Sequence, residues 1–377
     1  MKRILAASSP GEVAISVADG QLLVDYALWR PGAPDRVGDV YRGRVVARAP
    51  GMGGVFVSLG EQDGFLPDTR GGTGLAEGDA VLVRVSRAAQ GGKGPRLEVV
   101  GPLAELESRP ERGVASRCAM VLAEARSGPP GLVLPGPNPV ERLAQLHDGA
   151  PVLTDEPGLA AALIPLLPGR VLVQRDLLDD ELAEQIEALS RPVVSLPGGA
   201  VCSIYPTPAL VAIDVDAGPA VAERRDKSAA HIALNQRIIP AIAAQIRLRN
   251  LSGAILVDLA GLSSRGRLAH GDAFREALRD DHLRPRFLGF TGLGLAEIVR
   301  PRVHPPVHEL LAGPHAAGLA ALRRVLVEGG RVLRASPAIA AVLEADPVAL
   351  PDLARRTGRT LMLQSDPSLG PTSWVIE

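Results

Sequence analysis

The first part of the chain alternates apolar and polar positions with the two-residue period of a β-strand. One such run covers residues 13–17 and the next begins at Leu22, with Asp19-Gly20 between them. Aspartate followed by glycine is typical of tight hairpin turns. The pattern therefore predicts a short two-stranded ribbon within residues 1–35, packed on the middle of the chain.

Residues 36–100 change to short runs rich in β-branched side chains. The clearest runs are 40–46, 55–59 and 80–85, and turn-forming segments such as Pro50-Gly51 separate them. About five short strands within so few residues are typical of a small closed β-barrel. We therefore expect a separate barrel domain here.

Beyond Leu196, apolar strands alternate with helical segments. The pattern predicts a strand at 210–215, a long helix at about 227–249, a strand at 254–259 and a helix at 271–279. Such alternation is typical of a mixed α/β domain, which we place at residues 196–310.

Two less regular regions complete the chain. Residues 101–195 are interrupted by Pro and Gly and predict helices at 117–126 and 179–189 around a short strand at 169–173. Residues 311–377 predict two or three helices and a terminal strand near 360–364. The expected fold class is α/β in the broad sense, a multidomain α+β chain.

The composition is that of a folded, globular protein. Of 377 residues, 46% are hydrophobic and 22% are charged, close to globular averages. No apolar run approaches the ~20 residues that span a bilayer, so we expect a cytoplasmic protein without membrane contact. Cys118 and Cys202 lack the spacing of zinc ligands, so neither a zinc site nor a disulfide framework is expected.

The charge is unevenly distributed although the formal net charge is only −1. Residues 224–302 contain fourteen Arg or Lys and seven Asp or Glu, a surplus of +7 that leaves −8 for the rest. A local basic footprint is typical of a nucleic-acid partner. The alternative is an ordinary solvated helix surface.

Two of the five phenylalanines, Phe56 and Phe65, lie in the expected barrel, and Lys93 stands in a glycine-rich loop beside it. Aromatic rings on such a barrel stack with unpaired bases, and a flexible ammonium binds phosphate. These residues are therefore candidate contacts for single-stranded RNA. The alternative is that both rings are core residues and that Lys93 is only solvated.

Two expected strands of the α/β domain end in carboxylates. Asp214 and Asp216 are two residues apart and so point the same way, and Asp258 ends the neighbouring strand. Sheet ends of this kind hold the ligands of α/β folds. Oxygen-only ligands favour Mg²⁺ or Mn²⁺ over zinc, which makes these acids candidate metal ligands. The alternative is that they cap a helix or pair with nearby arginines.

Several segments closely resemble the ribonuclease E/G family, and they occur in that family's order. They cover about three fifths of the chain together with the tail. The barrel matches are 37–45, 50–52, 64–67 and 92–97, and the matches in the α/β domain are 213–218, 247–251, 253–258, 274–278 and 294–302.

The resemblance implies an OB-fold RNA-binding barrel at 36–100, a reduced RNase H-like region at 101–195, a DNase I-like catalytic domain at 196–310 and a small domain at 311–377. It implies a Mg²⁺-dependent endoribonuclease that hydrolyses single-stranded RNA. In this interpretation Phe56, Phe65 and Lys93 contact RNA. Asp214 and Asp258 bind the metal, Asp216 joins them in catalysis, and Asn235 matches a helix asparagine of the family.

The chain also departs from the family's pattern. Asp216 replaces an asparagine at the metal site, Gly261 stands where a second strand acid is expected, and no arginine lies near Thr291-Gly292. The Cys-Pro-Xaa-Cys zinc link between subunits is absent, so an oligomer would not be zinc-linked. These departures motivate a second hypothesis, an RNA-binding protein with weak or lost catalysis. A third is a scaffold for another protein.

The shortened region 101–195 generates a prediction about the 5′ end of a substrate. A preference for 5′-monophosphate needs a preorganised pocket of arginine and hydroxyl donors, and no segment here matches such a pocket. A phosphate in water without such donors contributes only a screened charge. We expect nearly equal cleavage rates for matched 5′-monophosphate and 5′-hydroxyl RNAs. A rate ratio of about tenfold, ~1.4 kcal/mol, would reveal a sensor.

Overall fold

The computed structural model describes residues 1–100, 128–218, 227–261 and 264–377. They form two compact units. The first unit comprises Met1–Pro34, Pro139–Arg302 and Pro306–Glu377, and the second comprises Asp35–Asn138 with Val303–Pro305. Within the described ranges, no helix is both long and apolar enough to cross a membrane.

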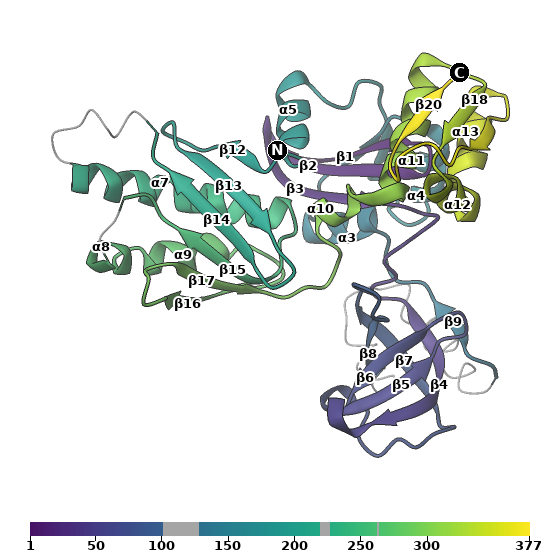
Figure 1. The fold of residues 1–377 in the computed structure, drawn as a ribbon, viewed down its shortest axis with the longest axis horizontal. Coiled ribbons are helices and arrows are strands. Elements are labelled where there is room, and N and C mark those ends of the chain that lie inside the picture. Colours follow the sequence, from purple (N-terminus) through teal and green to yellow (C-terminus); the bar gives the residue numbers. More distant parts are fainter. Residues whose placement is uncertain (101–127, 219–226, 262–263) are drawn as a thin grey trace. The chain divides into compact units, whose positions relative to one another are not determined.

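The second unit contains the expected closed barrel (Figure 1). Strands pair in the order β5-β6-β8-β7-β4, and β4 also pairs with β5, which closes the ring of five. A sixth strand, β9, pairs with β4 and comes from residues that we assigned to the middle region. The strands are β4 (Val40–Ala49), β5 (Gly54–Ser58), β6 (Asp63–Pro67), β7 (Ala80–Arg87), β8 (Arg96–Val99) and β9 (Gly131–Leu134), with short 3₁₀ turns η1 (Pro50–Met52) and η2 (Asp68–Arg70).

The barrel interior is filled by alternate residues of each strand. Val55, Val57, Leu66, Val83 and Leu97 are buried together, as expected where successive side chains point to opposite faces. Close packing also explains why position 64 is a glycine, because a β-carbon there would lie 2.7 Å from the side chain of Leu97. The intervening residues therefore point to the outside of the barrel.

The N-terminal ribbon has three strands, so the expectation of two was wrong. Its turn at Asp19-Gly20 was predicted correctly, but residues 2–9 form an additional strand. The ribbon continues into a five-stranded sheet of order β11-β10-β1-β2-β3. The strands are β1 (Lys2–Ser9), β2 (Glu12–Asp19), β3 (Leu22–Trp29), β10 (Val152–Thr154) and β11 (Val171–Val173).

Helices cover both faces of this first sheet. Helices α3 (Pro139–Leu146) and α4 (Pro157–Leu163) contribute Leu143 and Leu163 to a cluster with Ile4 and Ile15. Helix α5 (Asp180–Ala188) contributes Leu182 to a separate cluster. Helix α5 confirms the helix expected at 179–189, whereas the one expected at 117–126 lies outside the described residues.

A six-stranded sheet carries the predicted α/β pattern, in the order β12-β13-β14-β15-β17-β16. Its buried residues share one core with helices α7 and α9, and its other face carries the exposed Asp214 and Asp216. The strands are β12 (Val193–Ser195), β13 (Val201–Pro206), β14 (Val211–Asp216), β15 (Gly253–Asp258), β16 (Arg286–Phe290) and β17 (Ala296–Arg300), with helices α7 (Lys227–Leu248), α8 (Ser264–Leu268) and α9 (Gly271–Leu278).

The C-terminal region forms a small sheet of order β19-β18-β20 with helices packed on it. The strand expected near 360–364 is β19, and β20 follows it in the chain. The elements are α10 (Val307–Leu310), α11 (Gly313–Glu328), β18 (Val332–Ala335), α12 (Pro337–Ala345), α13 (Ala349–Thr357), β19 (Met362–Ser365) and β20 (Trp374–Ile376).

Two buried arginines connect elements around the six-stranded sheet. Arg249 donates to the carbonyls of Ala188, Leu189 and Arg191 at 2.8–3.0 Å and so holds the end of α5. Arg300 is 1% exposed and forms an ion pair with Asp281 at 2.7 Å. Because a buried charge is costly unless it is paired, these contacts fix the connecting loops in one arrangement.

Candidate active site and nucleic-acid interface

The predicted carboxylates emerge together from the open face of the six-stranded sheet. Strands β14 and β15 are parallel, and Asp214 lies directly opposite Asp258 in their register. Ile213 and Val257, one residue earlier on each strand, point into the core instead. Strand alternation therefore directs both carboxylates to the same, uncovered face.

The row containing these acids continues across the sheet. Asp214 is also opposite Ser203 of β13, which is opposite Val193 of β12. Asp216 lies two residues along β14 from Asp214 and is opposite Val201. Its Oδ1 accepts a hydrogen bond from the backbone of Gly218 at 2.9 Å. Asp216 thus shares the face with the acid pair and also shapes the turn that follows β14.

An arginine that the sequence analysis did not single out contacts the site. Arg267 of α8 donates to Oδ1 of Asp258 at 2.8 Å and to the carbonyl of Gly294 at 2.7 Å. One oxygen of Asp258 is therefore paired with an arginine, as the alternative for the strand-end acids predicted. Only the fold brings Arg267 there, since nine residues separate it from Asp258.

The segment after β15 is held by Asn235, which is fully buried on α7. Its Nδ2 donates to the carbonyl of Ala260 at 3.0 Å and to that of His231 at 2.8 Å. The family-matched asparagine thus positions the chain that follows Asp258. Its role is structural support of the acid rather than contact with the open face.

The structure gives a physical reason for glycine at position 261. Gly261 has φ +59°, a left-handed conformation that is strained for most side chains. A β-carbon there would also overlap the ring of His231. His231 therefore fills the space in which an acid at position 261 would begin.

The donor set suits a magnesium ion better than zinc. In the described part of the chain, no group of three or more His, Cys, Asp or Glu residues is placed to hold a metal. Mg²⁺ is commonly bound by one or two carboxylates and keeps several waters, so two carboxylates such as Asp214 and Asp258 are ligands of the kind that this ion takes. Cys202 lies in the core and burial raises the pKa of its thiol to about 12, which opposes thiolate ligation.

The barrel presents its two phenylalanines on its outer surface. Phe56 and Phe65 are cross-strand neighbours, and their ring centroids are 5.5 Å apart in an edge-to-face arrangement. Neither ring belongs to the buried core, and both are partly exposed. The alternative that they are core residues is therefore wrong. Lys93 is exposed in the turn closed by the Gln90–Lys93 bridge.

A second basic residue adjoins the rings. Arg96 of β8 is opposite Phe65, and its guanidinium carbon lies 5.8 Å from the centre of that ring. Phe56, Phe65 and Arg96 thus form a row across three strands. The sequence analysis missed Arg96, although its position three residues after Lys93 on an alternating strand was a usable signal.

The comparison with known proteins matches the part of the chain that contains the candidate acids. The model of the Ribonuclease E/G family matches residues 173–303, which include Asp214, Asp216 and Asp258. Over this segment the chain is similar to the ribonuclease E/G family. The matched segment runs from β11 to the end of β17, so it contains the complete six-stranded sheet.

Individual members of the ribonuclease E/G family match different shares of the chain. Ribonuclease E of Nostoc is 39% identical over 138 residues, which cover 35% of this chain and 20% of that protein. Ribonuclease E of Escherichia coli is 26% identical over 82% of this chain and 38% of its own length. Ribonuclease G of Escherichia coli is 24% identical, with coverage of 82% and 81%. The chain therefore spans well under half of the two ribonuclease E proteins.

The contact between Gly261 and His231 generates a prediction. We expect Gly261→Asp to lower the free energy of unfolding by about 1–3 kcal/mol, because it adds backbone strain and overpacking. His231→Ala should recover part of that loss when the two changes are combined. Chemical denaturation of the four proteins of this double-mutant cycle measures the coupling. Strictly additive effects would show that the ring does not oppose a side chain at position 261.

Proposed function

We propose that this chain is an endoribonuclease that cleaves single-stranded RNA by Mg²⁺-dependent hydrolysis. The observation that carries the proposal is the pairing of Asp214 with Asp258, in register on the open face of the sheet that the family model covers. The names of the relatives, ribonuclease E and ribonuclease G, support the same reaction class. Cytoplasmic RNA would be the natural substrate.

The two carboxylates would hold the metal at the sheet surface. Asp214 is exposed and Asp258 is 46% exposed, so both are accessible to a phosphate of the substrate. A bound Mg²⁺ supplies Lewis-acid stabilisation of the charge that develops on that phosphate. Arg267 holds one oxygen of Asp258 in place and leaves the second oxygen for the cation. Asp216 adds a further negative charge on the same face.

The barrel would hold the RNA strand. Base stacking on Phe56 and Phe65 needs unpaired bases, because the faces of paired bases are already stacked. Lys93 lies in the turn before β8 and Arg96 is the first residue of that strand, and both would contact phosphates. This division of labour assigns binding to the barrel and hydrolysis to the acid pair.

A second candidate function is RNA binding with weak or lost catalysis. Two observations favour it: the ion pair between Arg267 and Asp258 at 2.8 Å, and an aspartate instead of an asparagine at position 216. The ion pair competes with a cation for the same carboxylate. The second candidate predicts RNA affinity without Mg²⁺-dependent turnover.

The metal site generates a prediction for cleavage. We expect Asp214→Asn or Asp258→Asn to abolish Mg²⁺-dependent cleavage of a fluorescent single-stranded RNA while its affinity changes little, because the acids do not hold the strand. Asp272→Asn is the matched control, since this carboxylate on α9 is 97% exposed and outside the site. Cleavage that persists in both site variants with the same metal requirement would remove these acids from the reaction. Wild-type binding without cleavage would favour the second candidate.

The aromatic row generates a prediction for binding. Combining Phe56→Ala with Phe65→Ala should weaken single-strand affinity, because each stacked base contributes about 1–3 kcal/mol. Leu132→Ala is the control, since this apolar side chain of β9 is also exposed. Fluorescence anisotropy measures affinity, and circular dichroism checks folding. Loss of the barrel fold, or unchanged affinity in a folded variant, would contradict the stacking role.

A further inference from the structure

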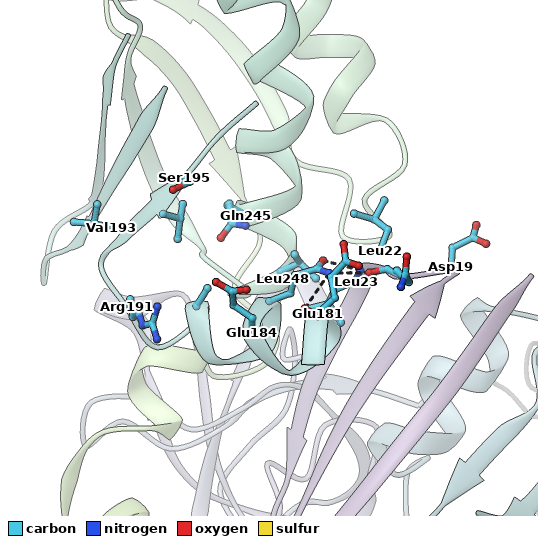
Figure 2. Close-up of a pocket in the computed structure, with 14 residues that line it drawn as sticks. Asp19, Leu22, Leu23, Glu181, Glu184, Arg191, Val193, Ser195, Gln245 and Leu248 are labelled. Atoms are coloured by element: carbon cyan, nitrogen blue, oxygen red, sulfur yellow. Dashed lines mark hydrogen bonds between the residues drawn. The ribbon is translucent and has the colours of Figure 1, made fainter. Parts of the chain in front are cut away.

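A groove lies between helix α5, strand β12 and the β2–β3 hairpin (Figure 2), and neither Asp214 nor Asp258 is among the residues that line it. Its volume is about 660 Å³. Figure 2 shows Glu181 and Glu184 of α5 across the groove from Val193 and Ser195 of β12, with Gln245 of α7 between them. We call this cavity the α5–β12 groove.

One wall of the groove is the unpaired edge of a sheet. Strand β12 is the first strand of the six-stranded sheet, and among the described strands it pairs with β13 alone. The carbonyl of Pro192 accepts a hydrogen bond from the amide of Ile204, and the amide of Leu196 donates one to the carbonyl of Ala200. Both groups therefore point toward β13. Because backbone groups alternate along an antiparallel strand, those of Val193 and Ser195 point away from the sheet. Among the described residues, no hydrogen bond satisfies them.

The opposite wall is acidic. Glu181 and Glu184 form no ion pair within the described residues, whereas Arg191, the one basic residue lining the groove, is paired with Glu187 at 2.5 Å. The lining also exposes apolar surface, since Leu22 is 62% and Val193 is 46% exposed. The groove therefore offers unsatisfied backbone groups, uncompensated negative charge and apolar contacts in one place.

The walls are held in position before any ligand binds. Gln185 accepts a hydrogen bond from the amide of Leu23 at 3.0 Å and donates to the carbonyl of Gln21 at 2.7 Å, which ties α5 to the hairpin. Arg249 fixes the C-terminal end of α5 through the carbonyls described above. A preformed groove loses little ordering entropy on binding.

We propose that the α5–β12 groove binds an extended basic peptide segment of a partner protein, which adds a strand to the edge of β12. Main-chain hydrogen bonds to Val193 and Ser195 would supply affinity, as in other cases of strand addition. Side chains of the added strand alternate, so Lys or Arg residues would face Glu181 and Glu184 while apolar residues on the opposite face would lie beside Val193. The negative charge disfavours RNA, and the proposal does not depend on nuclease activity.

The first test uses the full chain and a fluorescein-labelled peptide of alternating Lys and Val. Fluorescence anisotropy should show saturable binding. We expect affinity at least about tenfold weaker, or ~1.4 kcal/mol, for a peptide of alternating Glu and Val and for a Lys/Val peptide with N-methylated backbone amides. Equal binding of the N-methylated peptide would overturn strand addition, and equal binding of the acidic peptide would overturn the role of the carboxylates. Absence of binding overturns the proposal.

The second test changes the protein. Glu184→Lys should weaken binding of the Lys/Val peptide by at least about tenfold, whereas Asp180→Lys, at an exposed position on the same helix that does not line the groove, should change it by less than about twofold. Ser195→Pro removes an outward-pointing amide and should abolish binding. Equal effects of the two lysine variants would indicate unspecific charge attraction and overturn the site.

A third measurement keeps the wild-type protein, in case Ser195→Pro fails to fold. The Lys/Val peptide should slow hydrogen exchange of the Val193 and Ser195 amides, and unchanged exchange at both would overturn the proposal. Sedimentation of the chain without peptide identifies the competing occupant. A concentration-dependent dimer that protects the same two amides would show that a second copy of this chain fills the groove.

Discussion

The parallel pairing of β14 with β15 is the interaction on which the candidate active site depends. It places Asp214 opposite Asp258, although 44 positions separate them in the chain. In the part of the chain that the structure describes, the pairing is stabilised from the side on which Ile213, Val257 and the buried face of α7 form a common core. A shift of register by one residue would exchange core and open faces, so hydrophobic burial on one face fixes the acids on the other.

The same rule of alternation governs the barrel. Val55, Val57 and Leu66 fill its interior, and this directs Phe56 and Phe65 outward as neighbours. In both units, the residues proposed for function therefore occupy strand faces that the core does not use. Because the buried face supplies the core packing, the residues on the opposite face can serve binding or catalysis without loss of that packing.

The structure gives physical reasons for positions at which this chain departs from the family pattern. Glycine at position 261 accommodates both a left-handed backbone and the ring of His231. The ion pair of Arg267 with Asp258 brings a positive charge to a face that Asp216 has made more negative. Added negative charge and a close cation have opposite effects on a metal site, so under the proposed function the balance of Asp216 and Arg267 would set how strongly the acid pair holds Mg²⁺.

The local sequence determined much of this protein. Short runs of β-branched residues predicted the barrel strands, the alternation of apolar strands with helical segments predicted β14, α7, β15 and α9, and the i, i+2 spacing placed Asp214 and Asp216 on one face. These features depend on neighbouring residues, and local patterns report them directly. Long-range contacts could not be predicted from local patterns. Short strands such as β9 and β10 exist only because distant partners satisfy their backbone groups.

Tertiary structure alone therefore decided the rest. It added β1 to the N-terminal ribbon, brought Arg267 to Asp258, set Arg96 beside Phe65 and formed the α5–β12 groove from segments that lie far apart in the chain. None of these contacts follows from local composition. Strand pairing and side-chain contact depend on the burial and hydrogen bonding of the whole fold, whereas periodicity records only which face of each element is apolar.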